Sequence, residues 1–279
     1  MTRSGRNGAP ATMRLARIAA GVLLVGLTGA ALTGCSLFKP CLGLAGCGGT
    51  VVTPTSTSAP GGGTSYPVHT DIVGTTFWVG EIFDPNADDG SQVLSTYDSN
   101  WLANYGGCDG TTAGGSCETE ARSAANDYFP TEITPKENPF YLDLPFDDVN
   151  DPAAFARRDQ VVPWAGQEPY ASHSGDSNFS YMKNRWVALS YNGATCYAQI
   201  EDAGPGEYND AEYVFGADDA RPLNSRYGGA GMDVSPAVVG CLAFDELNGE
   251  QGGISWQFVD DSAVPPGPWT KVVTTSQVQ

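Results

Sequence analysis

Two acidic residues stand at the ends of short predicted elements, where a side chain can take part in chemistry. Asp233 lies in the apolar stretch GMDVSPA, two residues before Ser235. Ser235 and the proline that follows it are typical of a helix N-cap and of the first residue of a helix. Asp202 lies in QIEDAGP, where a strand-like segment ends and the chain turns. We expect the two carboxylates to meet across the mouth of a barrel, an arrangement suited to general acid–base catalysis. The alternative is an acid at 233 that only caps or pairs near the helix start.

Short β-rich segments must position these acids. Segments rich in β-branched and aromatic residues predict strands at 75–79, 138–144, 185–191, 195–200 and 254–259. Asn192-Gly193 joins the third and fourth as a hairpin. Helices are predicted at two places only, over 118–128 and from Ser235 onward. Many short strands, two helices and long loops predict a mainly β fold, a single barrel with insertions.

The N-terminus has the pattern of an export signal. Four arginines precede a short apolar run over 18–27, which is followed by small residues and Cys35. The run is too short for a transmembrane helix. The sequence LTGC resembles the bacterial lipobox, which predicts a lipoprotein signal peptide over 1–35 ending at a lipidated Cys35. The protein would then be exported and lipid-anchored at the extracytoplasmic face of the cell membrane. An ordinary signal peptide with an incidental cysteine is the alternative.

The segment after the signal predicts a tether rather than a fold. Residues 36–69 are rich in Gly, Ser, Thr and Pro, a composition that cannot bury a core. The folded domain is therefore expected over 70–279.

The net charge excludes some partners. The full chain carries a formal charge of −18, and removal of the four signal arginines takes it to −22. Such a surface repels nucleic acid and anionic lipid, so the membrane would be contacted through the lipid anchor only. Neutral or cation-rich polymers such as glycans are compatible with it. Solubility outside the cell would also explain the charge without any partner.

The remaining cysteines predict disulfides. Without Cys35 six are left, an even number in an exported chain. Fifteen pairings are formally possible. Zinc is less favoured, because no CxxC pair occurs, and neither a metal nor a cofactor is predicted. Proximity in the sequence favours the pairs Cys41–Cys47 and Cys108–Cys117, which leaves Cys196–Cys241 as the third.

Two motifs together carry a resemblance to a known fold. The segment 184–205, ending in Gly204-Pro205, and the later Asp233-Val-Ser-Pro-Ala237 resemble the double-psi β-barrel of expansins, rare lipoprotein A and family-45 endoglucanases. Those families have a strand pair leading to "Asp-x-Gly-Pro" and later "Asp-Leu-Ser-x-Ala-Ala". The resemblance implies a six-stranded double-psi β-barrel with two short helices and long loop insertions.

The resemblance also implies site residues. Asp233 corresponds to the acid of the glycan groove, which is the general acid in the hydrolases, and Asp202 lies on the same side of the barrel. The opposing base of the endoglucanases lies near the first strand, where Glu81 or Asp98 is the candidate. Neither reproduces the family motif. The histidine of rare lipoprotein A has no counterpart near 138–145.

Aromatic side chains are candidates for stacking on sugar rings, whose C–H faces are apolar. The predicted substrate-binding residues are Tyr97, Trp101, Tyr141, Tyr197 and Trp78.

Three functions remain open at this point. The first is an expansin-like barrel that binds or remodels cell-wall polysaccharide, either peptidoglycan or β-glucan. The second is a glycoside hydrolase or lytic enzyme with Asp233 as general acid. The third is a non-catalytic structural envelope lipoprotein.

Overall fold

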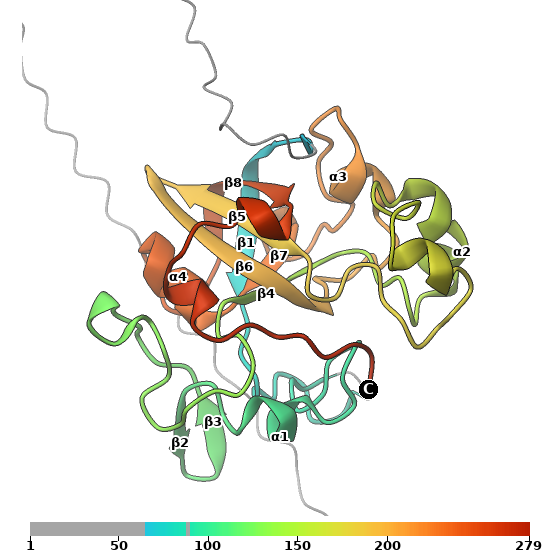
Figure 1. The fold of residues 1–279 in the computed structure, drawn as a ribbon. Helices are drawn as coiled ribbons and strands as arrows, with labels where there is room; N and C mark the ends of the chain where they lie inside the picture. Colours follow the sequence, from blue (N-terminus) through green and yellow to red (C-terminus); the bar gives the residue numbers. More distant parts are fainter. Residues whose placement is uncertain (1–64, 88–89) are drawn as a thin grey trace, which may run out of the picture. The chain divides into compact units, whose positions relative to one another are not determined.

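Six strands close into a barrel in the part of the chain that the structure describes, residues 65–87 and 90–279 of a computed structural model (Figure 1). Neighbouring strands around the barrel follow the order β1-β7-β4-β6-β5-β8. Their bounds are β1 His69–Thr76, β4 Tyr141–Leu144, β5 Trp186–Tyr191, β6 Ala194–Ala203, β7 Met232–Val234 and β8 Gln251–Val259. The mainly β, six-stranded barrel predicted from the sequence is confirmed.

The pairing of the strands brings distant parts of the sequence together. β5 and β6 form the predicted hairpin across Asn192 and Gly193, which both adopt positive φ, as a tight two-residue turn requires. β1 pairs with β7 in parallel, and β4 pairs with β6 in parallel, whereas β4 and β7 run antiparallel. Residues from four separate segments, β1, β7, β4 and β6, therefore lie side by side in the barrel.

The helix predicted from Ser235 is confirmed. Helix α4, Pro236–Leu242, begins with the side chain of Ser235 accepting a hydrogen bond from the Val238 N–H. Its apolar side chains are buried against the barrel, and its cysteine, Cys241, forms a disulfide with Cys196 of β6. This helix therefore fixes the position of the residues that precede it, including Asp233.

The helix predicted over 118–128 is wrong. That segment contains only the one-turn 3-10 helix η1, Ala124–Asn126. Asp127 and Tyr128 after it adopt positive φ, and the side chain of Arg122 before it is buried in contact with Asp109. Tertiary pairing of one arginine thus prevails over the local helix propensity.

The described residues contain four α-helices rather than the two expected. Helix α2, Pro152–Val161, begins with Asp151 as N-cap and proline at the first position, the same signal as in α4. The other two are one-turn helices, α1 Trp101–Tyr105 and α3 Ala211–Phe215. The remaining elements are strands β2 Thr111–Ala113 and β3 Ser116–Glu118, which form a separate hairpin, and 3-10 helices η2 Tyr170–His173, η3 Tyr227–Gly229, η4 Asp261–Ala263 and η5 Pro268–Thr270.

The core follows the alternation of the strands. In β8, Ile254, Trp256 and Phe258 are buried while the residues between them are partly exposed. A second aromatic cluster of buried residues, which includes Phe77, Trp101 and Tyr141, lies under the chain that follows β1. It anchors the loops on one side of the barrel.

Two of the predicted disulfides are confirmed, Cys108–Cys117 and Cys196–Cys241. Cys35, Cys41 and Cys47 lie outside the described residues, as do the predicted signal peptide and most of the tether. Within the described ranges, no helix has the length and apolar character needed to cross a membrane.

Candidate functional site

A groove of about 1010 Å³ is lined by residues of β1, β4, β6 and β7 and by the loops around them. Its floor contains Asp143, Asp202 and Asp233, one each from β4, β6 and β7. Its walls come from loops after β1 and β6 and before β7 and β8. The prediction that Asp202 and Asp233 share one mouth of a barrel agrees with this arrangement.

Asp233 is in direct contact with a carboxyl group that the sequence did not single out. The Asp233 N–H donates to Oδ1 of Asp143 at 2.7 Å, and the two side chains also share a hydrogen bond. Thr75 on β1 donates its hydroxyl to the carboxylate of Asp233. Asp143 is the deeper of the pair, with 3% of its surface exposed, whereas Asp233 is partly exposed to the groove.

Burial raises the pKa of both members of this pair. Asp143 has its pKa held well above the usual value, first by desolvation and then by the charges of Asp233 and Asp202. Desolvation raises the pKa of Asp233 to about 7, and its hydrogen bond with Asp143 opposes that rise. Since two carboxyl groups this close cannot both ionise at low cost, the pair keeps at least one proton at neutral pH.

Gly204 permits this arrangement. A Cβ built on Gly204 would lie 2.5 Å from Oδ2 of Asp143, closer than any real contact. The "Gly-Pro" part of the motif at 204–205 therefore makes room for a carboxyl group on the neighbouring strand.

Asp202 is held by the loop that crosses above it. Its Oδ1 accepts the N–H of Thr96 at 2.7 Å and that of Ala203 at 2.8 Å. Thr96 also donates its hydroxyl to Asp147, so one residue ties two groove acids in place. Desolvation raises the pKa of Asp202 to about 7 despite the two N–H donors.

Glu81 lies on the opposite wall, in the loop after β1. Desolvation raises its pKa to about 7, and the charge of Asp233 contributes to the rise. The loop that carries Glu81 is fixed by the disulfide hairpin: the N–H of Asp109 donates to the Val79 carbonyl at 2.9 Å, and Trp78 Nε1 donates to the Cys117 carbonyl at 3.0 Å.

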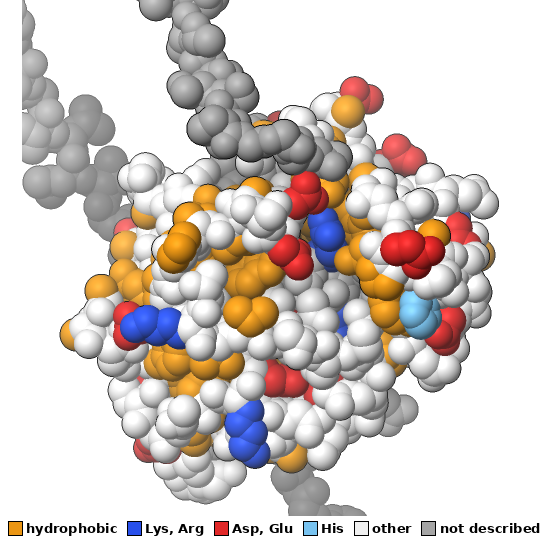
Figure 2. All heavy atoms as spheres, in the orientation of Figure 1, with side chains coloured by type: hydrophobic (Ala, Val, Ile, Leu, Met, Phe, Trp, Pro, Cys, Tyr) orange, Lys and Arg blue, Asp and Glu red, His pale blue; other side chains and the backbone are white. Residues whose placement is uncertain are grey.

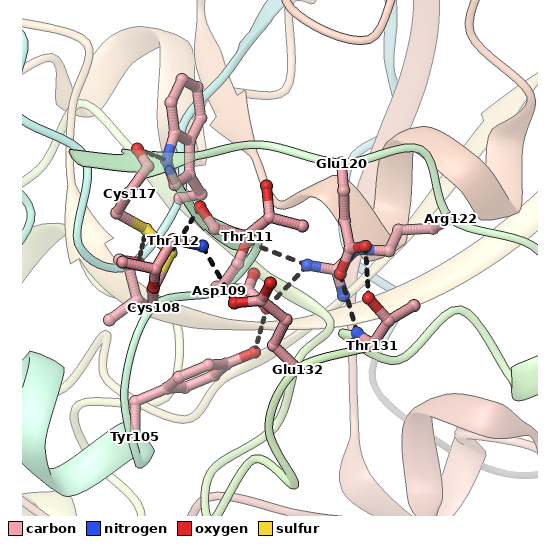
Figure 3. The surroundings of a disulfide bond; sticks show 12 residues. Tyr105, Cys108, Asp109, Thr111, Thr112, Cys117, Glu120, Arg122, Thr131 and Glu132 are labelled. Carbon is pink, nitrogen blue, oxygen red and sulfur yellow. Dashed lines mark hydrogen bonds and ion pairs between the residues drawn. A yellow bond between two sulfur atoms is a disulfide. The ribbon is translucent and has the colours of Figure 1, made fainter. Parts of the chain in front are cut away.

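A buried polar network stabilises that hairpin (Figure 3). The carboxylate of Asp109, fully buried, accepts hydrogen bonds from Tyr105 at 2.5 Å, Tyr141 at 2.7 Å and Arg122 at 2.9 Å. Tyr141 is two residues before Asp143 on β4, and its hydroxyl also accepts the Val79 N–H. The network thus connects the strand of Asp143 with the loop of Glu81.

The geometry limits how these acids can work. Asp143 and Asp233 are within hydrogen-bond distance, much closer than the roughly 5–5.5 Å of a nucleophile and acid in a retaining glycosidase. They can therefore act as one unit that delivers or accepts a proton. A second, separate carboxylate in the groove must come from Asp202 or Glu81.

The other residues predicted for the site lie elsewhere. Asp98 is 1% exposed and does not line the groove, because its carboxylate is used to accept hydrogen bonds from Asn100, Asn104 and Gln279. Four of the predicted sugar-stacking rings are also buried. Tyr97, Trp101 and Tyr141 belong to the hydrophobic core, and Trp78 packs against the disulfide hairpin, where its Nε1 donates to the Cys117 carbonyl. Their positions do not fit stacking on a substrate. Tyr197 is partly exposed, but on the outer face of β6 rather than in the groove.

Exposed apolar residues of the groove were missed in the sequence. Of the eight large hydrophobic residues exposed among the described residues, four line this groove: Phe83, Leu94, Tyr208 and Tyr227. Three of them lie in loops and Tyr227 begins the 3-10 helix η3, so no periodic sequence pattern separates them from core residues. Asp143 had a signal, an acid within an apolar strand, but its partner on β7 is 90 residues away in the sequence.

Over the described residues, no group of three or more histidine, cysteine and acidic side chains is placed to hold a metal ion. Comparison of the chain with known protein families and with curated proteins found no significant match.

Proposed function

We propose that this groove cleaves the glycosidic bonds of a neutral cell-wall polysaccharide, with the Asp143–Asp233 pair as the proton donor. The observation that carries the proposal is the hydrogen-bonded pair of carboxyl groups at the floor of the groove. The groove is large enough for several atoms of a substrate on each side of this pair. A donor whose pKa is about 7 keeps its proton near neutral pH and can still release it to a leaving oxygen.

Within this proposal each acid has its own part. Asp233, which faces the groove, donates its own proton, and Asp143 beneath it, whose pKa is held higher, keeps a proton and donates a hydrogen bond to the carboxylate that Asp233 becomes. Asp202 or Glu81, when ionised, stabilises positive charge that develops on the sugar or accepts a proton from the attacking group. The exposed rings of Phe83, Tyr208 and Tyr227 supply apolar surfaces for sugar rings.

The double-psi type of barrel belongs to the same proposal. It is supported by the two parallel strand pairs of a closed six-stranded barrel and by the presence of both motifs at one groove. Export and attachment to the membrane through Cys35 would bring the groove to the wall on the extracytoplasmic face, with peptidoglycan or β-glucan as the substrate.

The test uses the full chain with Cys35→Ser, which prevents lipidation, incubated with peptidoglycan and with β-glucan. We expect released reducing or anhydro ends, and at least about a 100-fold lower rate in Asp233→Asn, the range that loss of a general acid gives. Glu250→Gln is the matched control, because it removes an exposed carboxylate that lines the same groove. Equal release by wild type and Asp233→Asn would contradict the proposal.

The second candidate function is binding or loosening of the polysaccharide without cleavage. The four exposed apolar residues on the groove favour it, since they need no proton transfer to act. It predicts that wild type and Asp233→Asn sediment equally with insoluble glycan and that neither releases sugar.

A further inference from the structure

Part of the outer face of strands β5, β6 and β8 is exposed. Two rows of outward-facing residues cross these strands, since Ala188 lies opposite Tyr197 and Gln257, and Ser190 lies opposite Thr195 and Ser255. All six are partly or largely exposed. Further along β6 the same face is covered: Gln199 is 1% exposed, because Thr274 of the C-terminal segment exchanges hydrogen bonds with its amide.

The exposed part of this outer face is concave, and two aromatic side chains lie beside it. A shallow depression of about 230 Å³ is lined by these six residues and by Val68, which is 52% exposed. Beside it the rings of Tyr197 and Trp269 pack with their centroids 5.1 Å apart. Trp269 is fixed by its Nε1, which donates to the Pro265 carbonyl at 2.9 Å, and by edge contact with Phe140.

This face lacks charge in an otherwise acidic chain. The sequence has 32 acidic and 14 basic residues, yet none of the residues that line the depression is charged. Figure 2 shows hydrophobic side chains gathered over β5, β6 and α4, with most acidic side chains nearer the edges of this view. A nucleic acid would require cations, which the depression does not offer.

The residue types on this face also favour a sugar polymer over a protein as the binding partner. Protein interfaces depend on large anchors such as Trp, Tyr and Arg at their centre, but the centre here is Ala188, Ser190 and Ser255. Hydroxyl and amide groups in a shallow depression, next to a fixed pair of aromatic rings, suit sugar hydroxyls and the apolar faces of sugar rings.

We propose that this face, defined by Ala188, Ser190, Thr195, Tyr197, Ser255 and Gln257, is a second, non-catalytic binding surface for neutral polysaccharide. It holds the polymer at a place separate from the groove, because no residue lines both hollows. The surface acts on long or insoluble chains and adds nothing to a short oligosaccharide in the groove. It does not require that the groove be catalytic.

The test measures sedimentation of the full chain with insoluble β-glucan and with peptidoglycan sacculi, in the Cys35→Ser background. Ser190→Lys places a charge in the middle of the face, and Tyr197→Ser removes the aromatic edge. We expect each to weaken binding about three- to tenfold, the range of one aromatic contact, with no change in turnover of a short soluble oligosaccharide. Thr112→Lys is the matched control, since it adds the same charge on the exposed β2 strand.

Thermal unfolding measurements show whether each variant is folded. If Tyr197→Ser is not folded, the result for Ser190→Lys alone decides the test. Binding by Ser190→Lys equal to that of Thr112→Lys would overturn the proposal. So would a wild-type dimer that Ser190→Lys turns into a monomer, because the face would then join two copies of the chain. If no sugar is ever released but Ser190→Lys still binds more weakly, the surface stands and the proposed cleavage fails.

Discussion

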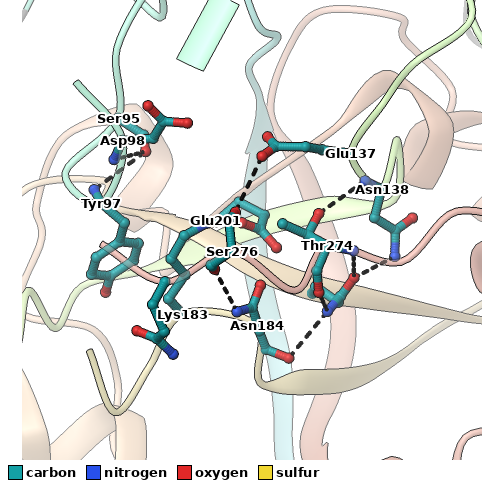
Figure 4. A network of polar contacts seen from close by, with 12 residues as sticks. Ser95, Tyr97, Asp98, Glu137, Asn138, Lys183, Asn184, Glu201, Thr274 and Ser276 are labelled. Atoms are coloured by element: carbon teal, nitrogen blue, oxygen red, sulfur yellow. Dashed lines mark hydrogen bonds and ion pairs between the residues drawn. The ribbon is translucent and has the colours of Figure 1, made fainter. Parts of the chain in front are cut away.

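Two groups of buried carboxyl groups in this molecule differ in how their charge is balanced. At the groove, Asp143, Asp202 and Asp233 come together without an ion-paired cation, since none of the ion pairs among the described residues involves them. In the second group, Glu137, Glu201 and Asp98 surround Lys183, and the C-terminal segment closes over them (Figure 4).

The second group is sealed around an ion pair. Lys183 Nζ lies 2.6 Å from Oε2 of Glu201, and each side chain is 1% exposed. Burial raises the pKa of Glu201 to about 7, while Lys183 opposes the rise. The same lysine has its pKa raised by these acids although burial lowers it.

The difference teaches which group can do chemistry. Where a lysine is paired with buried carboxylates and the chain closes over them, no proton can reach a substrate and the cluster holds loops together. Where the carboxyl groups form no ion pair, a proton must balance their charge, and at Asp233 that proton faces an open groove. The following changes test this distinction.

The largest effect on stability is expected from Lys183→Met. It leaves Glu201 buried without its cation, which costs about 3–5 kcal/mol in the free energy of unfolding. Chemical denaturation measures the loss, and the rate of glycan cleavage per folded molecule should not change. Asp233→Asn should leave the free energy of unfolding equal or higher, because it relieves repulsion at the groove. Similar losses in both variants would contradict the comparison.

The second prediction concerns pH. Asp202 and Asp233 have folded pKa values of about 7, above the roughly 3.9 of an unfolded aspartate. The folded protein therefore binds these protons more tightly, so their contribution to stability is full below about pH 4 and is lost as the pH rises to about 7. Melting temperatures across this range should fall less steeply with pH in Asp233→Asn than in wild type.

Activity should follow the same titration. Cleavage should decline above about pH 7, as Asp233 loses the proton that it donates while Asp143, whose pKa is held higher, keeps its own. A rate that is constant from pH 5 to 9 would separate the pair from catalysis.

A smaller effect is expected from Gly204→Ala. The added methyl would meet the carboxyl of Asp143, and such overpacking costs about 1–3 kcal/mol. The cleavage rate should fall as well, since the pair is displaced. Gly166→Ala is the control, because its methyl would enter open space. The interpretation of Gly204 fails if the two variants unfold at the same denaturant concentration.

The smallest effect on stability is expected at the N-caps of helices α4 and α2, which should differ in their effect on cleavage. Ser235→Ala and Asp151→Ala each remove an N-cap and should each cost about 1 kcal/mol in the free energy of unfolding. Only Ser235→Ala should also reduce cleavage, because Ser235 adjoins the β7 strand of Asp233 and accepts the Tyr141 N–H. An equal fall in both variants would mean that the cap has no link to the groove.

Much of the framework could be read from local patterns. The Asn192–Gly193 turn predicted a hairpin because few residues accept its backbone angles, and Ser235-Pro236 predicted a helix start because both residues suit the first turn. The helix at Asp151-Pro152 carried the same signal and could have been found. The lack of an α-helix over 118–128 could not have been read from the sequence, because it depends on the tertiary contact between Arg122 and Asp109.

Residue type and position at the end of a predicted element, then, determined by themselves that Asp202 and Asp233 were candidates, whereas Glu81 became one only through the resemblance to a known family. Only the tertiary structure decided that Asp143 is the partner of Asp233, that Asp98 is buried in another cluster and that most of the aromatic candidates form the core. The physical reason is the barrel's pairing: β4, β6 and β7 are far apart in sequence, and their register alone sets which carboxyl groups share a proton.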